Sequence, residues 1–519
     1  MAKYLYGASV QGIQSFIFQT NKLREIVGAS EIIKNITDQT FFDVAGIEKK
    51  DNGLFFKEGN TDKEFKGLIL ATAGNIKCEF LEEDKSKLEK LVREFPKRVM
   101  QEAPGITISQ AVVKFEGEIT NALTELETKL KVQRNIPSVP LETGYSILKR
   151  ARRTGGIVEK DDEDRATINK ISKSDSHQLF KILLKKENLT ELEKEMLTKE
   201  FSDITALSPN KWMAVVHADG NGLGNIIQNI GDELTQQGRF LEFSNTIQKS
   251  TEEALQKAFE DVILKDKENF ENSNPQKVYR YPIRPIVIGG DDVTFIIRAD
   301  LALDFTKIFL EEFENKTKEN FNSLIKINSF DILKNGLSAC AGIAYIKESY
   351  PIHYALDLAE ELTSEAKKMV KDESFPQNGD ISFSSLSFMK VEDSFVESLK
   401  EMQKRSKKAL QSAIDYNYGP YTLTEVKEGI PNLKSLKEDL QILENQSIKE
   451  SKGISKLRQL VSESFINKDR MDFMLKRMET VNEKLCDKLK LKEDLSPTAD
   501  KSEKKSKLLD LIQLHSFKY

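Results

Sequence analysis

The chain is poor in the residues that build thiolate or imidazole metal sites. Its 519 residues include three cysteines and four histidines. Cys78, Cys340 and Cys486 lie far apart and form no CxxC pair, which argues against a thiolate zinc site and against a disulfide framework. The histidines are isolated from one another, which argues against a histidine-rich metallohydrolase site. We therefore expect no zinc centre, and we expect the cysteines to be small buried hydrophobic residues.

Long apolar runs and an excess of basic residues are missing as well. No apolar run reaches the roughly 18 residues that would indicate a membrane span, and the first residues do not form a signal-peptide pattern. We therefore expect no membrane association and a cytoplasmic location. The 78 Lys and Arg against 83 Asp and Glu give a formal net charge of −5. This balance excludes a global basic field for nucleic acid, although local basic patches remain compatible with it.

Two segments repeat the order strand, helix, strand pair, helix, strand. The first has expected strands at 4–8, 67–80 (a pair turning at Gly74-Asn75) and 107–115, and expected helices at 13–36 and 84–101. The second has expected strands at 212–219, 285–297 (a pair) and 336–346, and expected helices from about residue 225, at 301–322 and at 352–370. This order is that of a ferredoxin-like palm. The predicted fold class is therefore α+β, with two ferredoxin-like palm (nucleotidyl cyclase-like) domains and a C-terminal helical domain.

The predicted domains follow changes in composition along the chain. Residues 1–150 form a first, non-catalytic palm, and the polar, charged stretch 151–210 is a linker or small helical insertion. Residues 211–390 form the second palm, and 391–519 form the C-terminal helical domain. The last assignment depends on apolar residues at helical spacing, which we expect in its core: Leu433, Leu436, Leu440, Leu443, Met471, Met474, Leu475 and Met478.

Three aspartates at strand ends of the second repeat carry the predicted chemistry. Asp219 ends one strand, and Asp291 and Asp292 follow two glycines at a hairpin between two apolar strands. Adjacent carboxylates at a tight turn repel each other, and Mg²⁺ prefers oxygen ligands. Asp219 alone is compatible with a strand-ending turn, and the pair alone with a hairpin tip. At a spacing that lets them converge in a palm, we predict Asp219, Asp291 and Asp292 as catalytic and as ligands of Mg²⁺ (or Mn²⁺).

Glycines and one lysine near these aspartates are predicted to bind nucleotide. The turn after Asp219 opens a helix whose free N–H groups suit phosphate, and the glycines before Asp291 let a ligand approach the backbone closely. Lys367 ends the helix at 352–370 and can reach a triphosphate, although a lysine there also favours a helix C-terminus. His217 shares a strand face with Asp219 and is interpreted as packed rather than catalytic. The predicted nucleotide-binding residues are Gly220, Asn221, Gly222, Gly289, Gly290 and Lys367.

These motifs resemble the CRISPR polymerase family, the large subunits of type III CRISPR effector complexes, with the Cmr type the closer match. Residues 6–18 and 22–30 resemble the start of that family's first palm, and 289–292 and 336–344 resemble its second. The resemblance implies two palms face to face and metal-dependent conversion of ATP into a cyclic oligoadenylate second messenger for antiviral defence. It also implies an acceptor pocket in the first palm. Guide RNA and target RNA would be partners through other CRISPR effector subunits.

The sequence departs from the family pattern in ways that leave other functions open. Asn221 stands where the family usually has a second aspartate, and Arg152-Arg153-Thr154-Gly155-Gly156 replaces the usual cysteine cluster between the palms. No HD nuclease domain precedes the first palm, so we expect no DNA cleavage. One alternative is an autonomous nucleotide cyclase or an AMP-conjugating enzyme with another acceptor. The other is a catalytically silent palm scaffold of an RNA complex, which Asn221 favours and the intact Gly-Gly-Asp-Asp motif disfavours.

Overall fold

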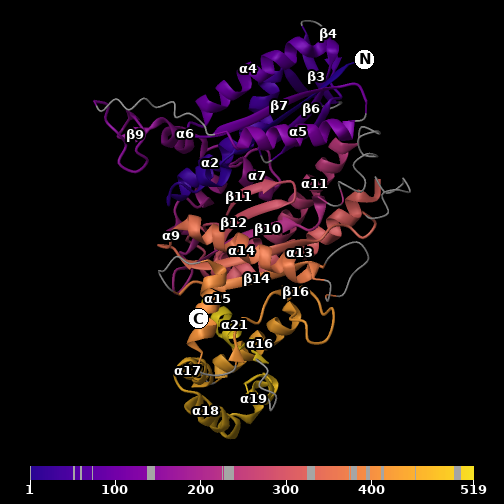
Figure 1. Ribbon diagram of the computed structural model, residues 1–519. Coiled ribbons are helices and arrows are strands. Elements are labelled where there is room, and N and C mark those ends of the chain that lie inside the picture. The colour runs from indigo at the N-terminus through magenta and orange to yellow at the C-terminus, as the bar shows by residue number, and fades with distance from the viewer. Residues whose placement is uncertain are drawn as a thin grey trace.

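The structure, a computed structural model, consists of three successive parts along one long axis (Figure 1). Two sheet-containing parts, formed by the first and the middle portions of the chain, are followed by a bundle of helices near the C-terminus. The described residues are 2–50, 53–58, 61–72, 74–117, 119–136, 147–224, 226, 239–323, 333–372, 375, 383–392, 398–410, 414–449, 452–495 and 504–518. Most of the helix expected from about residue 225 lies outside them.

The first palm contains a four-stranded antiparallel sheet in the order β5-β6-β1-β7. With the strands numbered in chain order this is 2-3-1-4, the ferredoxin-like arrangement that the sequence repeat predicts. α5 covers one face of the sheet through Leu126, which packs against Leu5 and Val113, and α2 and α4 lie over the other face. Its elements are β1 (Lys3–Gln11), α1 (Ile13–Ile17), α2 (Leu23–Asn35), η1 (Ile36–Thr40), α3 (Phe41–Ala45), β2 (Ile47–Lys50), β3 (Gly53–Glu58), β4 (Thr61–Glu64), β5 (Leu68–Thr72), β6 (Asn75–Leu81), η2 (Glu82–Asp84), α4 (Lys85–Glu102), β7 (Thr107–Phe115) and α5 (Ile119–Arg134).

The helix expected at 13–36 is divided into α1 and α2. The segment between these two helices contacts the second palm. There the Asn21 Oδ1 accepts a hydrogen bond from the backbone N–H of Ile352 over 2.9 Å. Ile352 begins α14, so the side chain satisfies one of the unpaired N–H groups at that helix start. The Ser30 hydroxyl on α2 also donates to the backbone carbonyl of Ile286 in the second palm.

The insertion between the palms contacts both of them. α6 packs on α2 so closely that a Cβ on Gly28 would lie 1.6 Å from the carbonyl oxygen of Lys170. α7 packs on β11 and α11 of the second palm. Besides the helices expected of a small helical insertion, this segment contains a short hairpin of two strands. Its elements are β8 (Val158–Lys160), β9 (Glu163–Asp164), α6 (Arg165–Lys173), α7 (Gln178–Leu184), α8 (Glu191–Met196) and α9 (Phe201–Ile204).

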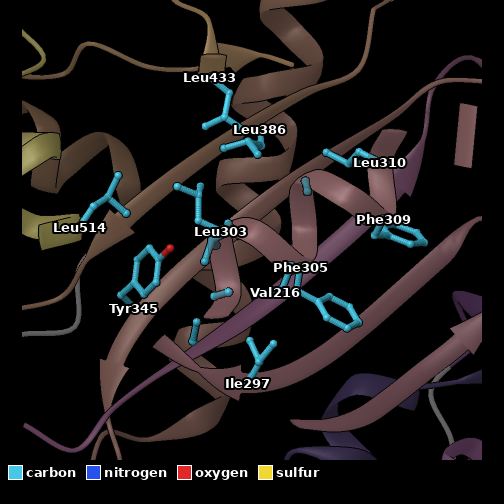
Figure 2. Close-up of a cluster of buried hydrophobic side chains, with 14 of the residues drawn as sticks. Val216, Ile297, Leu303, Phe305, Phe309, Leu310, Tyr345, Leu386, Leu433 and Leu514 are labelled. Atoms are coloured by element: carbon cyan, nitrogen blue, oxygen red, sulfur yellow. The ribbon is translucent and has the colours of Figure 1, made fainter. Parts of the chain in front are cut away.

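The second palm repeats the strand order of the first and extends it to β11-β12-β10-β13-β14-β16. α11 and α13 cover one face of the sheet, while α14 and the first palm cover the other. Figure 2 shows Val216 and Ile297 of the sheet against Leu303, Phe305 and Phe309 of α13. Its elements are β10 (Trp212–Gly220), α11 (Phe240–Ala258), η3 (Phe259–Leu264), α12 (Lys265–Ser273), β11 (Ile283–Gly289), β12 (Asp292–Arg298), α13 (Ala299–Asn320), η4 (Phe321–Ser323), β13 (Ala339–Lys347), α14 (Ile352–Lys371), β14 (Ser385–Lys390) and β16 (Tyr421–Thr422).

The alternation of side chains along β10 decides which of its residues face the first palm. Ala214 and Val216 lie in the core under α13, whereas Met213 and Val215 lie in the core shared with the first palm. Because successive side chains on a strand point to opposite faces, the odd-numbered residues that follow continue toward the first palm. The end of β10 therefore presents its polar side chains to the space between the palms.

The C-terminal part packs on the second palm and shares its core. The predicted core positions Leu433, Leu436, Leu440 and Leu443 are buried, and Figure 2 shows Leu433 and Leu514 beside the palm residues. Three short strands modify the expectation of helices alone: β16 joins the palm sheet, where Tyr421 stacks on Phe388, and β15 pairs with β17. The further elements are α15 (Leu399–Ala409), β15 (Ile414–Asp415), α16 (Leu433–Lys449), α17 (Lys452–Ile466), α18 (Lys468–Val481), α19 (Glu483–Lys488), α20 (Leu491–Leu495), β17 (Lys504–Lys505) and α21 (Leu508–Lys518).

Within the described ranges, no helix combines the length and the apolar character needed to span a bilayer.

Candidate active site

The two strands that carry the predicted aspartates are neighbours at the centre of the second sheet. β10 pairs with β12 in antiparallel register, with Ala218 opposite Val293. β12 continues from a tight hairpin in which Gly289 pairs with Asp292, so the turn residues are Gly290 and Asp291. Gly290 has a φ of 63°, a left-handed conformation that glycine adopts without strain. The end of β10 and the hairpin turn thus lie side by side, as the palm order predicts.

Asp291 lies against Asp219 and the glycine after it. A Cβ on Gly220, the residue after Asp219, would come within 2.6 Å of the Asp291 Oδ2. Position 220 therefore accommodates no side chain while Asp291 keeps this place. Burial, and next the negative charge of Asp219, raise the pKa of Asp291 well above the usual carboxyl range. These two carboxyl groups therefore form a site that favours a bound proton or a cation.

Lys367, which was predicted to bind nucleotide, lies beside one of the carboxylates. Its Nζ lies 2.5 Å from the Asp219 Oδ2 and donates a hydrogen bond to the Gly220 carbonyl over 2.8 Å. α14 is close enough to the sheet for this contact because Gly342 on β13 has no side chain: a Cβ there would lie 2.0 Å from the carbonyl oxygen of Ala359. Lys367 therefore supplies positive charge directly at the predicted site.

Asp292 faces the space between the palms beside His217. The side chain of Asp292 is 43% exposed, but its Oδ1 is buried and accepts no hydrogen bond from the residues that the structure describes. The His217 Nδ1 lies 3.5 Å from this oxygen and 3.1 Å from the hydroxyl of Thr294. Burial lowers the pKa of His217 to about 4, so the ring is neutral at pH 7 and places no positive charge beside the carboxylate. Burial, followed by the charges of Asp219 and Asp291, raises the pKa of Asp292.

Two of the predicted nucleotide-binding residues use their polar groups inside the protein. Asn221 is buried, and its backbone N–H donates to the carbonyl of Ser338 over 2.8 Å while its Nδ2 donates to the Ser338 hydroxyl over 3.0 Å. The backbone N–H of Gly290 donates to the Gln248 Oε1 over 2.6 Å. Gly222 has a φ of 71°, which meets the glycine preference expected for this turn. Nucleotide binding by these residues stays a prediction.

Two cavities adjoin the site. A cavity of about 950 Å³ lies between the palms, with walls from α1 and α2 of the first palm and from Gly289, Asp292 and Glu360 of the second. A smaller cavity of about 320 Å³ is lined by Asp219, Asp292 and Lys367. Ligand pockets commonly have volumes of about 300–1,000 Å³. A third cavity, of about 750 Å³, lies between the palm sheet and the C-terminal helices and contains none of the predicted site residues.

Four residues near the site were not among the predicted site residues. Gln14 of the first palm and Glu360 of α14 line both cavities at the site and are hydrogen-bonded to each other. Burial, followed by the charges of Asp357 and Asp219, raises the pKa of Glu360 to about 7. Gln248 and Thr251 contact the hairpin from α11. Polar residues are common on amphipathic helices, so the sequence does not distinguish these residues from other surface positions. Only their contacts with distant segments show that they belong to the site.

The donor set matches the chemistry of Mg²⁺ or Mn²⁺. Hard divalent cations take carboxylate oxygens, and the buried Asp292 Oδ1 is an oxygen without a hydrogen-bond donor in the described part of the chain. Within that part, no group of three or more His, Cys, Asp or Glu residues is already gathered closely enough to hold a metal. Asp219 interacts instead with Lys367. The residues therefore fit a divalent cation in type, with Lys367 as the cation that Asp219 holds in this structure.

A family model matches the part of the chain that contains these residues. Residues 212–375 match the model described as Cas10/Cmr2, second palm domain. The chain therefore carries a second palm domain of the Cas10/Cmr2 family. This match confirms the predicted resemblance to the large, palm-domain subunits of type III CRISPR effector complexes.

Similar solved structures are found, whereas none of the curated proteins matches the chain. A Csm1-Csm4 cassette in complex with cA4 is 12% identical with a TM-score of 0.49, over 99% of this chain and 70% of that chain. The same cassette with AMPPNP is 12% identical with a TM-score of 0.47, over 99% and 70%. Csm1 of T. onnurineus is 13% identical with a TM-score of 0.46, over 99% and 69%.

Proposed function

We propose that the chain is a metal-dependent nucleotidyltransferase that converts ATP into a cyclic oligoadenylate-type second messenger as a subunit of an RNA-guided type III CRISPR complex. The observation that carries the proposal is the convergence of Asp219, Asp291, Asp292 and Lys367 in a second palm domain of the Cas10/Cmr2 family. A cluster of like charges at the end of two central strands costs stability and is kept where function needs it.

Each residue has a separate role in the proposal. Asp219, Asp291 and Asp292 would hold Mg²⁺ or Mn²⁺, which when bound polarises the α-phosphate and stabilises the departing pyrophosphate. Lys367 provides a charge that binds phosphate oxygens once a metal ion neutralises Asp219. Neutral His217, which is hydrogen-bonded to Thr294, lies beside Asp292 without competing for it as a cation would. Gly220 leaves the space in which Asp291 approaches Asp219.

The cavity between the palms suits a substrate with more than one nucleotide. Its roughly 950 Å³ joins the site at Gly289 and Asp292 to the first palm, whose lining residues include Lys34 and Lys49. This arrangement supports an acceptor nucleotide on the first palm and a donor at the aspartates. Guide RNA and target RNA would act through other subunits of the complex.

The test is product formation by the purified chain from labelled ATP with Mg²⁺ or Mn²⁺, in the presence and absence of guide-bound target RNA and its protein partners. The proposal predicts oligoadenylate products that appear or increase with target RNA. Products of another kind that are independent of RNA would instead support an autonomous cyclase or an AMP-conjugating enzyme. No nucleotide conversion in any condition would refute the enzymatic proposal and support a scaffold.

A further inference from the structure

Two side chains of α11 bind the backbone at the tip of the Gly289–Asp292 hairpin. The backbone N–H of Gly290 donates to the Gln248 Oε1 over 2.6 Å, and the carbonyl of Gly290 accepts from the Thr251 hydroxyl over 2.6 Å. The polar backbone groups at the tip of a two-residue hairpin ordinarily face water. Here both groups of one residue are held by two side chains that lie one helical turn apart.

α11 is itself held firmly, so it provides a fixed support. Its apolar face buries Phe243, Ile247 and Leu255 in the core of the second palm. The Ser250 hydroxyl accepts a hydrogen bond from the Asn320 side chain at the end of α13, over 3.0 Å. Thr251 is fully buried, and Gln248 is further oriented by donating to the Glu252 carboxylate over 2.6 Å. Each of the two groups that bind Gly290 therefore has a defined position relative to the sheet.

The hairpin needs such support because its position decides where two of the predicted metal ligands lie. Asp291 and Asp292 follow Gly290 directly, and Asp291 lies so close to the end of β10 that a Cβ on Gly220 would be 2.6 Å from its Oδ2. A glycine in the turn adds conformational freedom that the two hydrogen bonds remove. Without these two hydrogen bonds the turn would be free to shift, and Asp291 and Asp292 would lose their alignment with Asp219.

We propose that Gln248 and Thr251 are positioning residues that fix the Gly289–Asp292 hairpin, so that Asp291 and Asp292 stay aligned with Asp219 for a divalent cation. The inference rests on the proposed function, because the alignment matters for a metal-dependent reaction. It goes further by assigning this task to α11, outside the palm motifs. In this role both side chains act through the backbone of Gly290.

The test compares variants that lose one hydrogen bond with variants that keep it. Gln248→Met removes the acceptor at nearly constant size, and Thr251→Val removes the hydroxyl at constant shape. Thr251→Ser restores the hydroxyl. Thr246→Val is the matched control, because the Thr246 hydroxyl makes the same kind of bond within α11, to the carbonyl of Glu242 over 2.7 Å. Amide hydrogen exchange of the 286–295 segment reports the hairpin, and Mn²⁺ affinity measured by electron paramagnetic resonance reports the alignment of the ligands.

Loss of either bond is expected to accelerate exchange at the hairpin about tenfold, which corresponds to one hydrogen bond, and to weaken Mn²⁺ binding by about tenfold. Thr251→Ser and Thr246→Val should behave like the wild type in both measurements. Unchanged exchange in both Gln248→Met and Thr251→Val overturns the proposal, and so does faster exchange with unchanged Mn²⁺ affinity. A wild-type chain that binds no Mn²⁺ and converts no ATP refutes the proposed function and the positioning role with it. If the wild-type chain binds Mn²⁺ and converts ATP, the variants test the positioning role of Gln248 and Thr251 separately from the proposed function.

Discussion

A methyl group added at position 220 would act on the predicted site through one contact. A Cβ on Gly220 would lie 2.6 Å from the Asp291 Oδ2 and 2.9 Å from the Asp291 Cβ. Ordinary van der Waals contact begins near 3.4 Å, so Asp291 would have to move by roughly 0.8 Å or more. A misplacement of about 1 Å costs on the order of a hundredfold in rate. We therefore expect Gly220→Ala to lower ATP turnover by about a hundredfold.

The same substitution should leave the fold intact. Overpacking typically costs about 1–3 kcal/mol, and here the displaced group is one side chain. Gly224→Ala is the control, because a Cβ at that position meets no atom of the described residues within 4 Å and the backbone is not left-handed. ATP turnover and thermal unfolding would be measured together for both variants. Wild-type turnover in a folded Gly220→Ala chain would refute the reasoning, because Asp291 would then function in a different place.

Three further predictions concern charge, pH and metal content. Lys367→Met should weaken nucleotide binding about tenfold or more in equilibrium titrations, whereas Lys368→Met, on the exposed face of the same helix, should not; equal effects would argue for general attraction. The Asp510 carboxyl accepts a hydrogen bond from Tyr421. Burial raises the pKa of Asp510 to about 7, so the folded chain retains a proton that the unfolded chain releases near pH 4. Stability should therefore fall as the pH rises from about 4 to 7, and Asp510→Asn should melt above the wild type at pH 8; an unchanged pH profile would contradict this. Because the three cysteines are buried and separate, elemental analysis should find well under one zinc per chain, and stoichiometric zinc would overturn that expectation.

The strand order of both palms was predictable because it depends on local periodicity. Apolar residues at alternate positions of β10 and a glycine turn before Asp291 are signals within a few residues of sequence, and the palm topology follows from their order. The same signals place Asp219 beside the hairpin. The division of the helix at 13–36 was not predictable, because it depends on the Asn21 side chain that caps a helix more than 300 residues away.

The surroundings of the aspartates were harder to predict than the aspartates themselves. Gln248 and Thr251 look like ordinary polar positions on an amphipathic helix, and only the packing of α11 brings them to Gly290. Asn221 was predicted to bind nucleotide from its place in a glycine-rich turn, yet its side chain is bonded to Ser338 in the interior. Hydrogen bonds between distant segments leave no periodic trace in a sequence, whereas turns and strands do.

The most direct test of the central claim is ATP conversion by the Asp291→Asn/Asp292→Asn double variant beside the wild type, with thermal unfolding of both recorded at the same pH. Burial raises the pKa of both carboxyl groups, so replacing them removes charge that the folded chain disfavours, and the variant should melt at the same temperature or higher. The account predicts a well-folded variant with no detectable turnover under conditions in which the wild type makes product. Wild-type turnover by the folded double variant would contradict it.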